Sequence, residues 1–137
     1  ASSGIGKSIA IAFAKEGATT VLTARNRKRL GAVAAEIARD GGTAHVVAAD
    51  VTIEAEVTNV FREVKEKFGR LDILINNAGV TLQADLASAT EKAVTNVIDV
   101  NLLAPILLTR ALLPAMLAQG KGAIVNISSL DGLFGSP

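Results

Sequence analysis

The chain alternates short apolar runs with segments of helical periodicity, and this alternation limits the folds open to it. The apolar runs are TTVLTA (19–24), AHVVAA (44–49), LDILIN (71–76) and AIVNIS (123–128). Between them, apolar residues recur every three or four positions, as they do on one face of a helix. Short connections from strand to helix to strand favour parallel strands with right-handed crossovers. We therefore predict an α/β protein with a Rossmann-like, doubly wound parallel sheet in a three-layer α/β/α arrangement.

The order of these elements begins with a helix, although the fold should begin with a strand. In a dinucleotide-binding sheet of spatial order 3-2-1-4-5, the strand before the first helix is the central one. Strands 19–24 and 71–76 would then face each other across a gap of about 10 Å, twice the usual strand spacing. Because a compact domain does not keep such a gap, we expect residues 1–137 to be a single partial dinucleotide-binding domain, incomplete at both ends.

Composition and charge exclude several classes of function. The formal net charge of +1 gives no strong attraction to nucleic acid or to an anionic membrane. The chain has no cysteine, which excludes disulfides and thiolate chemistry and fits a cytoplasmic protein. The apolar run LLAPILL is far shorter than the ~20 residues of a membrane span. No metal-ligand cluster is expected, and the single histidine, His45, is expected to be structural.

Helix starts are marked by two capping signals. Thr52 is expected to cap the helix that follows the second strand, with Glu54 in its first turn. Ser88 and Glu91 have the spacing of a capping box, which predicts the start of a long helical tract near residue 89.

The stretch ASSGIG (1–6) lies directly before the first apolar helical stripe. Gly4 and Gly6 would let the backbone approach a pyrophosphate, and the N–H groups and positive dipole end of the helix favour an anion there. The alternative is an ordinary flexible start to a helix. The glycine spacing alone leaves both interpretations open.

Arg25 follows the first strand, about 20 residues after the glycine turn, where a dinucleotide-binding fold carries its ribose-binding residue. No acidic residue stands there to accept from a free 2′-hydroxyl, whereas an arginine can pair a 2′-phosphate bidentately. We therefore expect Arg25 to bind this phosphate, with NADP preferred to NAD. Arg27, Lys28 and Arg29 are expected to form a solvated basic turn; without interleaved aromatic residues they do not indicate a nucleic-acid site.

Polar residues also follow the later strands, at the edge where parallel α/β sheets bind ligands. Asp50 follows the second strand and can either accept from an adenine amino group or cap the strand end. NNAG (76–79) follows the third strand and is expected to line the ligand crevice. Ser128 and Ser129 end the fourth strand, where a hydroxyl can either hold a substrate carbonyl or satisfy nearby backbone.

Asn101 is a polar residue within the apolar stretch VIDVNLLAPILL, inside the helical tract 89–119. Pro105 removes a backbone N–H from this tract, so we expect a kink near 101–105. A buried amide is costly unless it is hydrogen-bonded. Asn101 should therefore bond the backbone at the kink, serve a site, or do both.

Together, ASSGIG, NNAG, VNLLAP and IVNISS resemble the short-chain dehydrogenases/reductases, in the family's order and over the whole length of the chain. The match is most similar to the 3-oxoacyl-(acyl carrier protein) reductase-like branch. It implies an NADP(H)-dependent oxidoreductase that interconverts a carbonyl and an alcohol by hydride transfer. The alternative is a non-catalytic dinucleotide-binding sensor or scaffold of the same fold. The resemblance also implies a small-molecule substrate and a homo-oligomer, a dimer or homotetramer, for which the apolar tract 89–119 offers a helix face.

The resemblance further implies which residues bind the cofactor. Its phosphates would lie near Ser2, Ser3, Ile5 and Gly6. The adenine would contact Asp50 and Val51. The ribose and nicotinamide side would lie along Asn77, Ala78, Gly79 and Val80.

The family's catalytic set is Asn, Ser, Tyr and Lys. Asn101 matches the Asn and would hold a water in a proton relay, and Ser129, with Ser128 as its neighbour, matches the Ser that fixes the substrate carbonyl. The chain has no Tyr and ends at Pro137, before the expected Tyr-x-x-x-Lys. Because Tyr supplies the proton as hydride reaches the carbonyl, we expect residues 1–137 alone to be inactive and the parent protein to be an enzyme.

Overall fold

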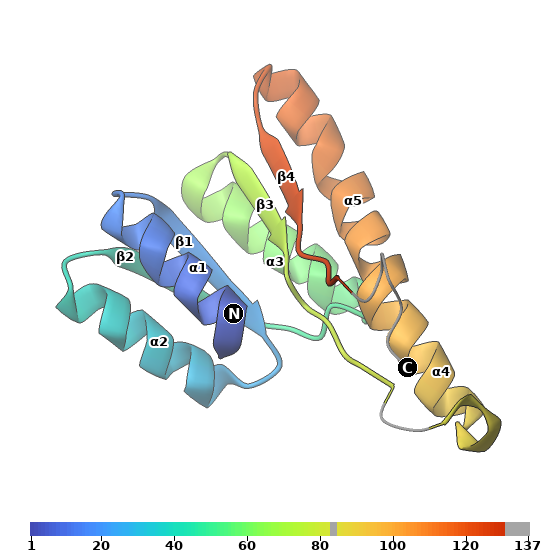
Figure 1. Ribbon diagram of the computed structural model, residues 1–137. Helices are drawn as coiled ribbons and strands as arrows, with labels where there is room; N and C mark the ends of the chain where they lie inside the picture. The colour runs from blue at the N-terminus through green and yellow to red at the C-terminus, as the bar shows by residue number, and fades with distance from the viewer. Residues whose placement is uncertain (83–84, 131–137) are drawn as a thin grey trace.

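The computed structural model describes residues 1–82 and 85–130, in which helices and strands alternate along the chain (Figure 1). The strands are β1 (Thr19–Ala24), β2 (Thr43–Ala48), β3 (Ile73–Asn76) and β4 (Ala123–Asn126). The helices are α1 (Gly4–Lys15), α2 (Arg27–Arg39), α3 (Glu54–Phe68), α4 (Glu91–Ile98) and α5 (Ala104–Gln119), with a short 3-10 turn η1 (Leu86–Ser88) and a π-helical segment η2 (Asp99–Leu103). Each predicted strand is present, β3 and β4 being two residues shorter than predicted.

The four strands form two parallel pairs. β1 pairs with β2 from Thr19↔Thr43 to Ala24↔Ala48, and β3 pairs with β4 from Ile73↔Ala123 to Asn76↔Asn126. The arrowheads of β1, β3 and β4 point the same way in Figure 1, and β2 is parallel to β1. The carboxyl ends of the strands therefore lie along a common edge.

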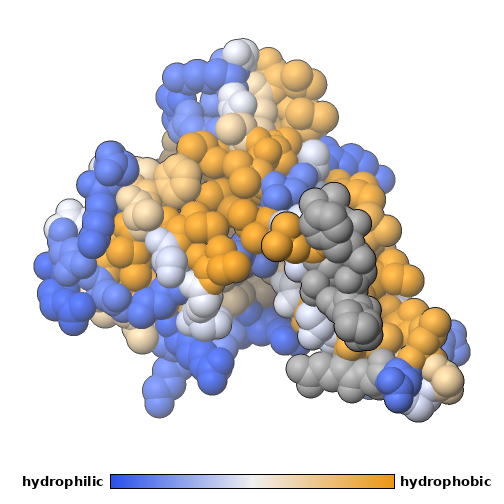
Figure 2. Space-filling model, in the orientation of Figure 1, coloured by the Kyte–Doolittle hydropathy of each residue, from blue (hydrophilic) through white to orange (hydrophobic). Residues whose placement is uncertain are grey.

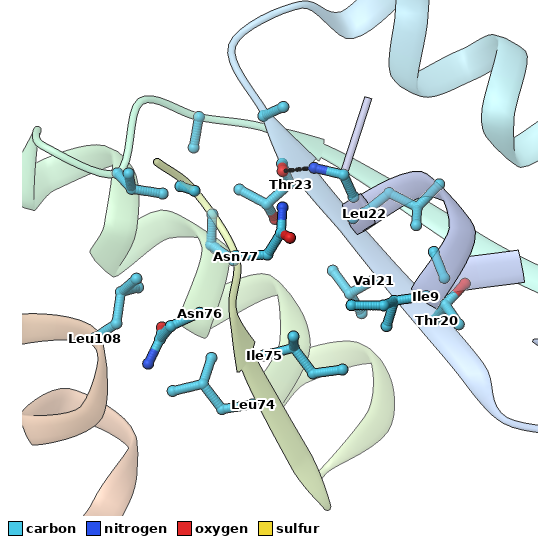
Figure 3. Close-up of a pocket in the computed structure, with 18 of the residues that line it drawn as sticks. Ile9, Thr20, Val21, Leu22, Thr23, Leu74, Ile75, Asn76, Asn77 and Leu108 are labelled. Atoms are coloured by element: carbon cyan, nitrogen blue, oxygen red, sulfur yellow. Dashed lines mark hydrogen bonds between the residues drawn. The ribbon is translucent and has the colours of Figure 1, made fainter. Parts of the chain in front are cut away.

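A hollow of about 1470 Å³ lies between β1 and β3, which belong to separate sheets. Figure 3 shows Val21 on one side of it and Ile75 on the other, with Ile9 of α1 nearby. Residues of α3 and α5, among them Val60 and Leu108, also line it. The prediction that the first and third expected strands do not pair with each other is confirmed.

Helices cover the strands from both faces. Leu22 of β1 packs with buried residues of α1 and α2, and this cluster consists of Ala10, Ala14, Leu22, Leu30, Val33 and Ile37. Val47 of β2 packs instead against Val60 and Val64 of α3. Because neighbouring side chains of a strand point to opposite faces, one strand pair serves two helical layers. This arrangement gives the predicted three layers.

His45 links β2 to α3. Its Nε2 lies 3.3 Å from Glu63 Oε2, its Nδ1 lies 2.9 Å from Lys67 Nζ, and its ring meets Phe68 edge to face. The hydrogen bond to His45 lowers the pKa of the Glu63 carboxyl. These contacts agree with a structural role for the histidine.

The helical tract after β3 is irregular where Pro105 stands. α4 continues into the π-helical η2, and Pro105 occupies the first turn of α5. Proline cannot donate the backbone bond that an α-helix would need there, so the hydrogen-bonding pattern changes before it. The π-helical segment Asp99–Leu103 overlaps the region 101–105 where a kink was expected, and the kink itself stays a prediction.

Both predicted helix caps are wrong by position. The residue before α3 is Ile53, which has no capping side chain, because the Thr52 hydroxyl donates to Asp50 Oδ1 instead. α4 is capped by Thr90, whose side chain accepts from Ala93 N–H, and Ser88 lies in η1.

By length and composition alone, the continuous helical run Glu91–Gln119 could cross a membrane, with a mean hydropathy of 1.7. The sequence argument from the short run LLAPILL did not anticipate this. Ala104, Leu112 and Met116 of the run are buried against the protein, whereas Leu102, Ile106 and Leu117 are exposed. The apolar character of the run thus serves the core on one side only.

We expect Leu30→Ala to lower the free energy of unfolding by about 2 to 5 kcal/mol, because Leu30 is fully buried between α2 and β1 and its truncation leaves a cavity. The measurement is urea unfolding followed by circular dichroism. Leu86→Ala is the matched control, since Leu86 is 79% exposed and its loss should stay within about 0.5 kcal/mol. Equal losses in the two variants would contradict the assignment of the core.

Candidate cofactor site

The glycine turn at the start of α1 lies against the loop that follows β3. Gly4 has a φ of +55°, a conformation that favours glycine. A Cβ on Gly6 would lie 2.6 Å from Asn77 Nδ2, so no larger residue fits without moving that amide. Ser3 precedes the helix without a side-chain capping bond, which leaves the N–H groups of the first turn open to an anion. The turn and the loop are thus parts of one wall.

Asp50 and Arg25 come from neighbouring strand ends and face each other across 4.0 Å, from Arg25 Nη1 to Asp50 Oδ2. The other oxygen, Asp50 Oδ1, accepts from Thr52 N–H at 3.0 Å and from the Thr52 hydroxyl at 2.8 Å. The Asp50 N–H donates to Glu56 Oε2 at 2.7 Å. The Thr52 backbone bond is the largest cause of a pKa of Asp50 below its ordinary value, so this residue stands as an oriented carboxylate.

Two asparagines pair at the ends of β3 and β4. Asn76 Nδ2 donates to Asn126 Oδ1 at 2.8 Å, and Asn76 is only 7% exposed. Among the described residues, Asn76 Oδ1 has no hydrogen-bond partner, and Asn76 lines the hollow between β1 and β3. Figure 3 shows Asn77, the next residue, directed toward β1. Asn76 therefore joins β3 to β4, and both asparagines line the hollow.

Asn101 holds the loop after β3 in place. Its Nδ2 donates to the Val80 carbonyl at 2.7 Å, and its Oδ1 accepts from Val80 N–H at 2.9 Å. The residue is exposed, so the premise of a buried amide is wrong. The Asn101 side chain also does not bond the backbone of its own helical tract. It bonds the backbone of Val80, which lies in a loop 21 residues earlier in the sequence. This double bond to Val80 ties the helical tract to the candidate site.

Ser128 and Ser129 follow β4 directly. The Ile127 N–H donates to the Asn76 carbonyl at 2.9 Å, which extends the β3–β4 pairing by one bond, and the two serines are exposed beyond it. The remainder of the run toward the expected catalytic tyrosine, residues 131–137, lies outside the described residues.

The structure brings most of the predicted cofactor residues to one hollow. The predicted residues that line it are Ser2, Ser3, Gly6, Arg25, Asp50, Val51, Asn77, Ala78, Gly79 and Val80. Gly4 and Ile5 lie in the first turn of α1, with the Ile5 side chain 63% exposed. Asn101, Ser128 and Ser129 are not among the lining residues, although Asn101 holds Val80, which is.

Two participants were missed by sequence reasoning. Asn126 had no signal beyond its place at the end of a strand, and the pairing of Asn76 with it depends on the strand register. Glu56 lies six residues from Asp50, a separation that no periodicity connects, because the chain turns between them.

Among the described residues, no group of three or more His, Asp or Glu could hold a metal ion.

The chain matches the short chain dehydrogenase family over residues 1–137, and it belongs to that family. The family resemblance that the motifs indicated is therefore confirmed. The Rossmann-type α/β class is confirmed as well, since solved structures that are similar to this chain have that fold.

Among curated relatives, the chain is 43% identical over 134 residues to an uncharacterised oxidoreductase of Staphylococcus saprophyticus, covering 96% of this chain and 57% of that protein. It is 36% identical over 137 residues to the 3-oxoacyl-[acyl-carrier-protein] reductase of Thermotoga maritima, covering 100% of this chain and 56% of that protein. The chain thus spans about half the length of the curated relatives it matches.

Many solved structures are similar to this one, and two of them were solved with a cofactor. A metagenomic short-chain oxidoreductase in complex with NADP superposes with a TM-score of 0.91 at 42% identity, over 96% of this chain and 60% of that chain. The L-sorbose reductase of Gluconobacter frateurii, complexed with NADPH and L-sorbose, gives a TM-score of 0.93 at 37% identity, over 98% of this chain and 52% of that chain.

We expect Asn101→Ala to speed hydrogen exchange of the Val80 amide roughly fivefold, because the variant lacks the acceptor that holds this N–H. The measurement is amide exchange followed by NMR. Asn59→Ala is the control, since the Asn59 amide bonds Glu63 in α3 instead. An unchanged Val80 exchange rate would show that Asn101 does not hold the loop.

We expect Asp50→Asn to reduce the loss of stability in acid. The lowered pKa of Asp50 means that its carboxylate stabilises the fold above its ordinary pKa of about 3.9, and that this stabilisation disappears as the pH falls through the folded-state pKa. The free energy of unfolding should therefore fall less steeply in the variant between about pH 5 and pH 2. A slope as steep as that of the unchanged protein would contradict this role.

Proposed function

We propose that the protein is an NADP(H)-dependent oxidoreductase that interconverts a carbonyl and an alcohol. The observation that carries this proposal is the placement of Arg25 in the wall of a single hollow with the glycine turn and the loop after β3. A dinucleotide needs these three parts together: backbone for its pyrophosphate, a cation for a 2′-phosphate, and a loop along its second ribose. We propose residues 1–137 as one partial dinucleotide-binding domain of this enzyme.

The residues present fit such a cofactor. Gly6 leaves room that a Cβ would fill, and the open first turn of α1 offers N–H groups for a pyrophosphate held by Ser2 and Ser3. Arg25 would pair the 2′-phosphate, and Asp50, oriented by Thr52, would accept from the adenine amino group, with Val51 beside it. When bound, the nicotinamide cofactor supplies the hydride.

The candidate catalytic residues lie toward the carboxyl ends of β3 and β4. Ser129 would hold the substrate carbonyl by a hydrogen bond. Asn101 uses one donor and one acceptor on Val80, so its remaining N–H and lone pair are what it could offer a water in a proton relay. Asn101 would thus also position the loop 77–80 along the cofactor.

The substrate class proposed is a small carbonyl compound or the corresponding alcohol. Among the similar proteins whose names state a reaction are a 3-oxoacyl-[acyl-carrier-protein] reductase and an L-sorbose reductase. The solved complexes with NADP and NADPH support NADP over NAD. We further propose a cytoplasmic protein that forms a homo-oligomer, a dimer or tetramer, through the exposed apolar face of α4 to α5, where Ile98, Leu102 and Ile106 lie.

Isothermal titration with NADPH and NADH, and turnover with a panel of ketones and a 3-oxoacyl thioester, test the function. We expect NADPH to bind at least tenfold more tightly than NADH and Arg25→Ala to reduce this difference, because only NADPH carries the phosphate that Arg25 would pair. The control is Arg39→Ala, at the far end of α2 beside Asp40, which should change neither affinity. Equal affinities in the unchanged protein would refute the role of Arg25. Because residues 1–137 alone are expected to be inactive, turnover is measured on the parent protein, and cofactor binding there without turnover of any carbonyl would favour a non-catalytic dinucleotide-binding module.

A further inference from the structure

A second, smaller hollow of about 260 Å³ lies between the glycine turn and α2. Ser2 and Ser3 line it from the turn, Lys7 from α1, and Arg29 and Glu36 from α2. Figure 1 shows the start of α1 beside the first turn of α2, which brings these residues together. The hollow is therefore next to the place where the cofactor phosphates are proposed to bind.

Its charges do not cancel. Lys7 Nζ lies 2.8 Å from Glu36 Oε2, and this bond lowers the pKa of the Glu36 carboxyl, so the two form an ion pair. Arg29 has no carboxylate within 4.0 Å among residues 1–82 and 85–130, and a guanidinium stays charged at any physiological pH. Arg29 therefore gives the hollow one uncompensated positive charge.

Arg29 also lines the large hollow, on the same wall as Arg25, Ser2 and Ser3. The Asn26 side chain accepts from the Arg29 backbone N–H at 2.9 Å, which holds the Arg29 backbone in the first turn of α2. The flanking residues Arg27 and Lys28 line neither hollow. Arg29 thus differs from Arg27 and Lys28, because it lines both hollows together with Ser2 and Ser3 of the glycine turn.

We propose that Arg29 is a second ligand of the 2′-phosphate, holding it from α2 while Arg25 holds it from the end of β1. This inference rests on the proposed NADP-dependent function. Two guanidinium groups can share the oxygens of one phosphate, and each offers a planar pair of donors that a lysine lacks. Ser2 and Ser3, which line both hollows, supply hydroxyl donors beside them.

The test is isothermal titration of the full chain with 2′,5′-ADP and with 5′-AMP, which differ only in the 2′-phosphate. We expect Arg29→Ala to weaken 2′,5′-ADP binding about tenfold and to leave 5′-AMP binding unchanged. Arg29→Lys keeps the charge without the paired donors and should give an intermediate loss. Arg27→Ala is the matched control, an arginine of the same turn that lines neither hollow, and it should bind both ligands as the unchanged protein does.

Three outcomes would overturn the inference in distinguishable ways. If Arg29→Ala binds 2′,5′-ADP as tightly as the unchanged protein, Arg29 is not a phosphate ligand, and the proposed function stands. If Arg29→Ala weakens both ligands equally, the residue supports the fold or the adenosine and not the phosphate; a thermal melt separates these two causes. If the unchanged protein itself does not prefer 2′,5′-ADP to 5′-AMP, the proposed NADP preference falls, and the inference with it.

Discussion

Parallel strand pairing is the constraint on which the rest of the molecule depends. Since β1 and β2 run the same way, as β3 and β4 do, every connection must return across the sheet through a helix, and every strand ends at the same edge. Arg25, Asp50 and the loop 77–80 reach one hollow for this reason, although they are far apart in the sequence. The chemistry of the site follows from the direction of the strands.

The glycine turn is fitted to this edge by contact as well as by conformation. Gly6 lies so close to Asn77 that a methyl group would displace the amide, and Asn101 holds the same loop from its other side through Val80. Figure 2 shows that apolar side chains gather over the middle of this face of the molecule, among polar ones. The glycine turn, the loop after β3 and Asn101 are thus held together by short-range contacts.

Periodicity predicted the helices and strands because each depends on burial of one face. For β1, both predicted end residues agree with the structure. The cap of α3 was not predicted correctly, since the Thr52 hydroxyl can bond either the first turn of the helix or Asp50. In the folded turn it donates to Asp50 Oδ1. Asn101 was expected to be buried because its neighbours in sequence are apolar, but the π-helical segment directs it to Val80. The family motifs indicated the cofactor residues, whereas Glu56 and Asn126 act through contacts that no sequence pattern records.

The amide pair between Asn76 and Asn126 has a consequence for how the second strand pair assembles. β3 and β4 share only four residue positions, few enough for alternative alignments to compete. A slip of β4 by one residue would turn Asn126 to the opposite face and leave Asn76 Nδ2, now bonded at 2.8 Å, without its acceptor in a buried position. The misaligned sheet would carry that cost while the aligned one does not, so a single pair of amides selects the alignment that sets Ser128 and Ser129 at the sheet edge.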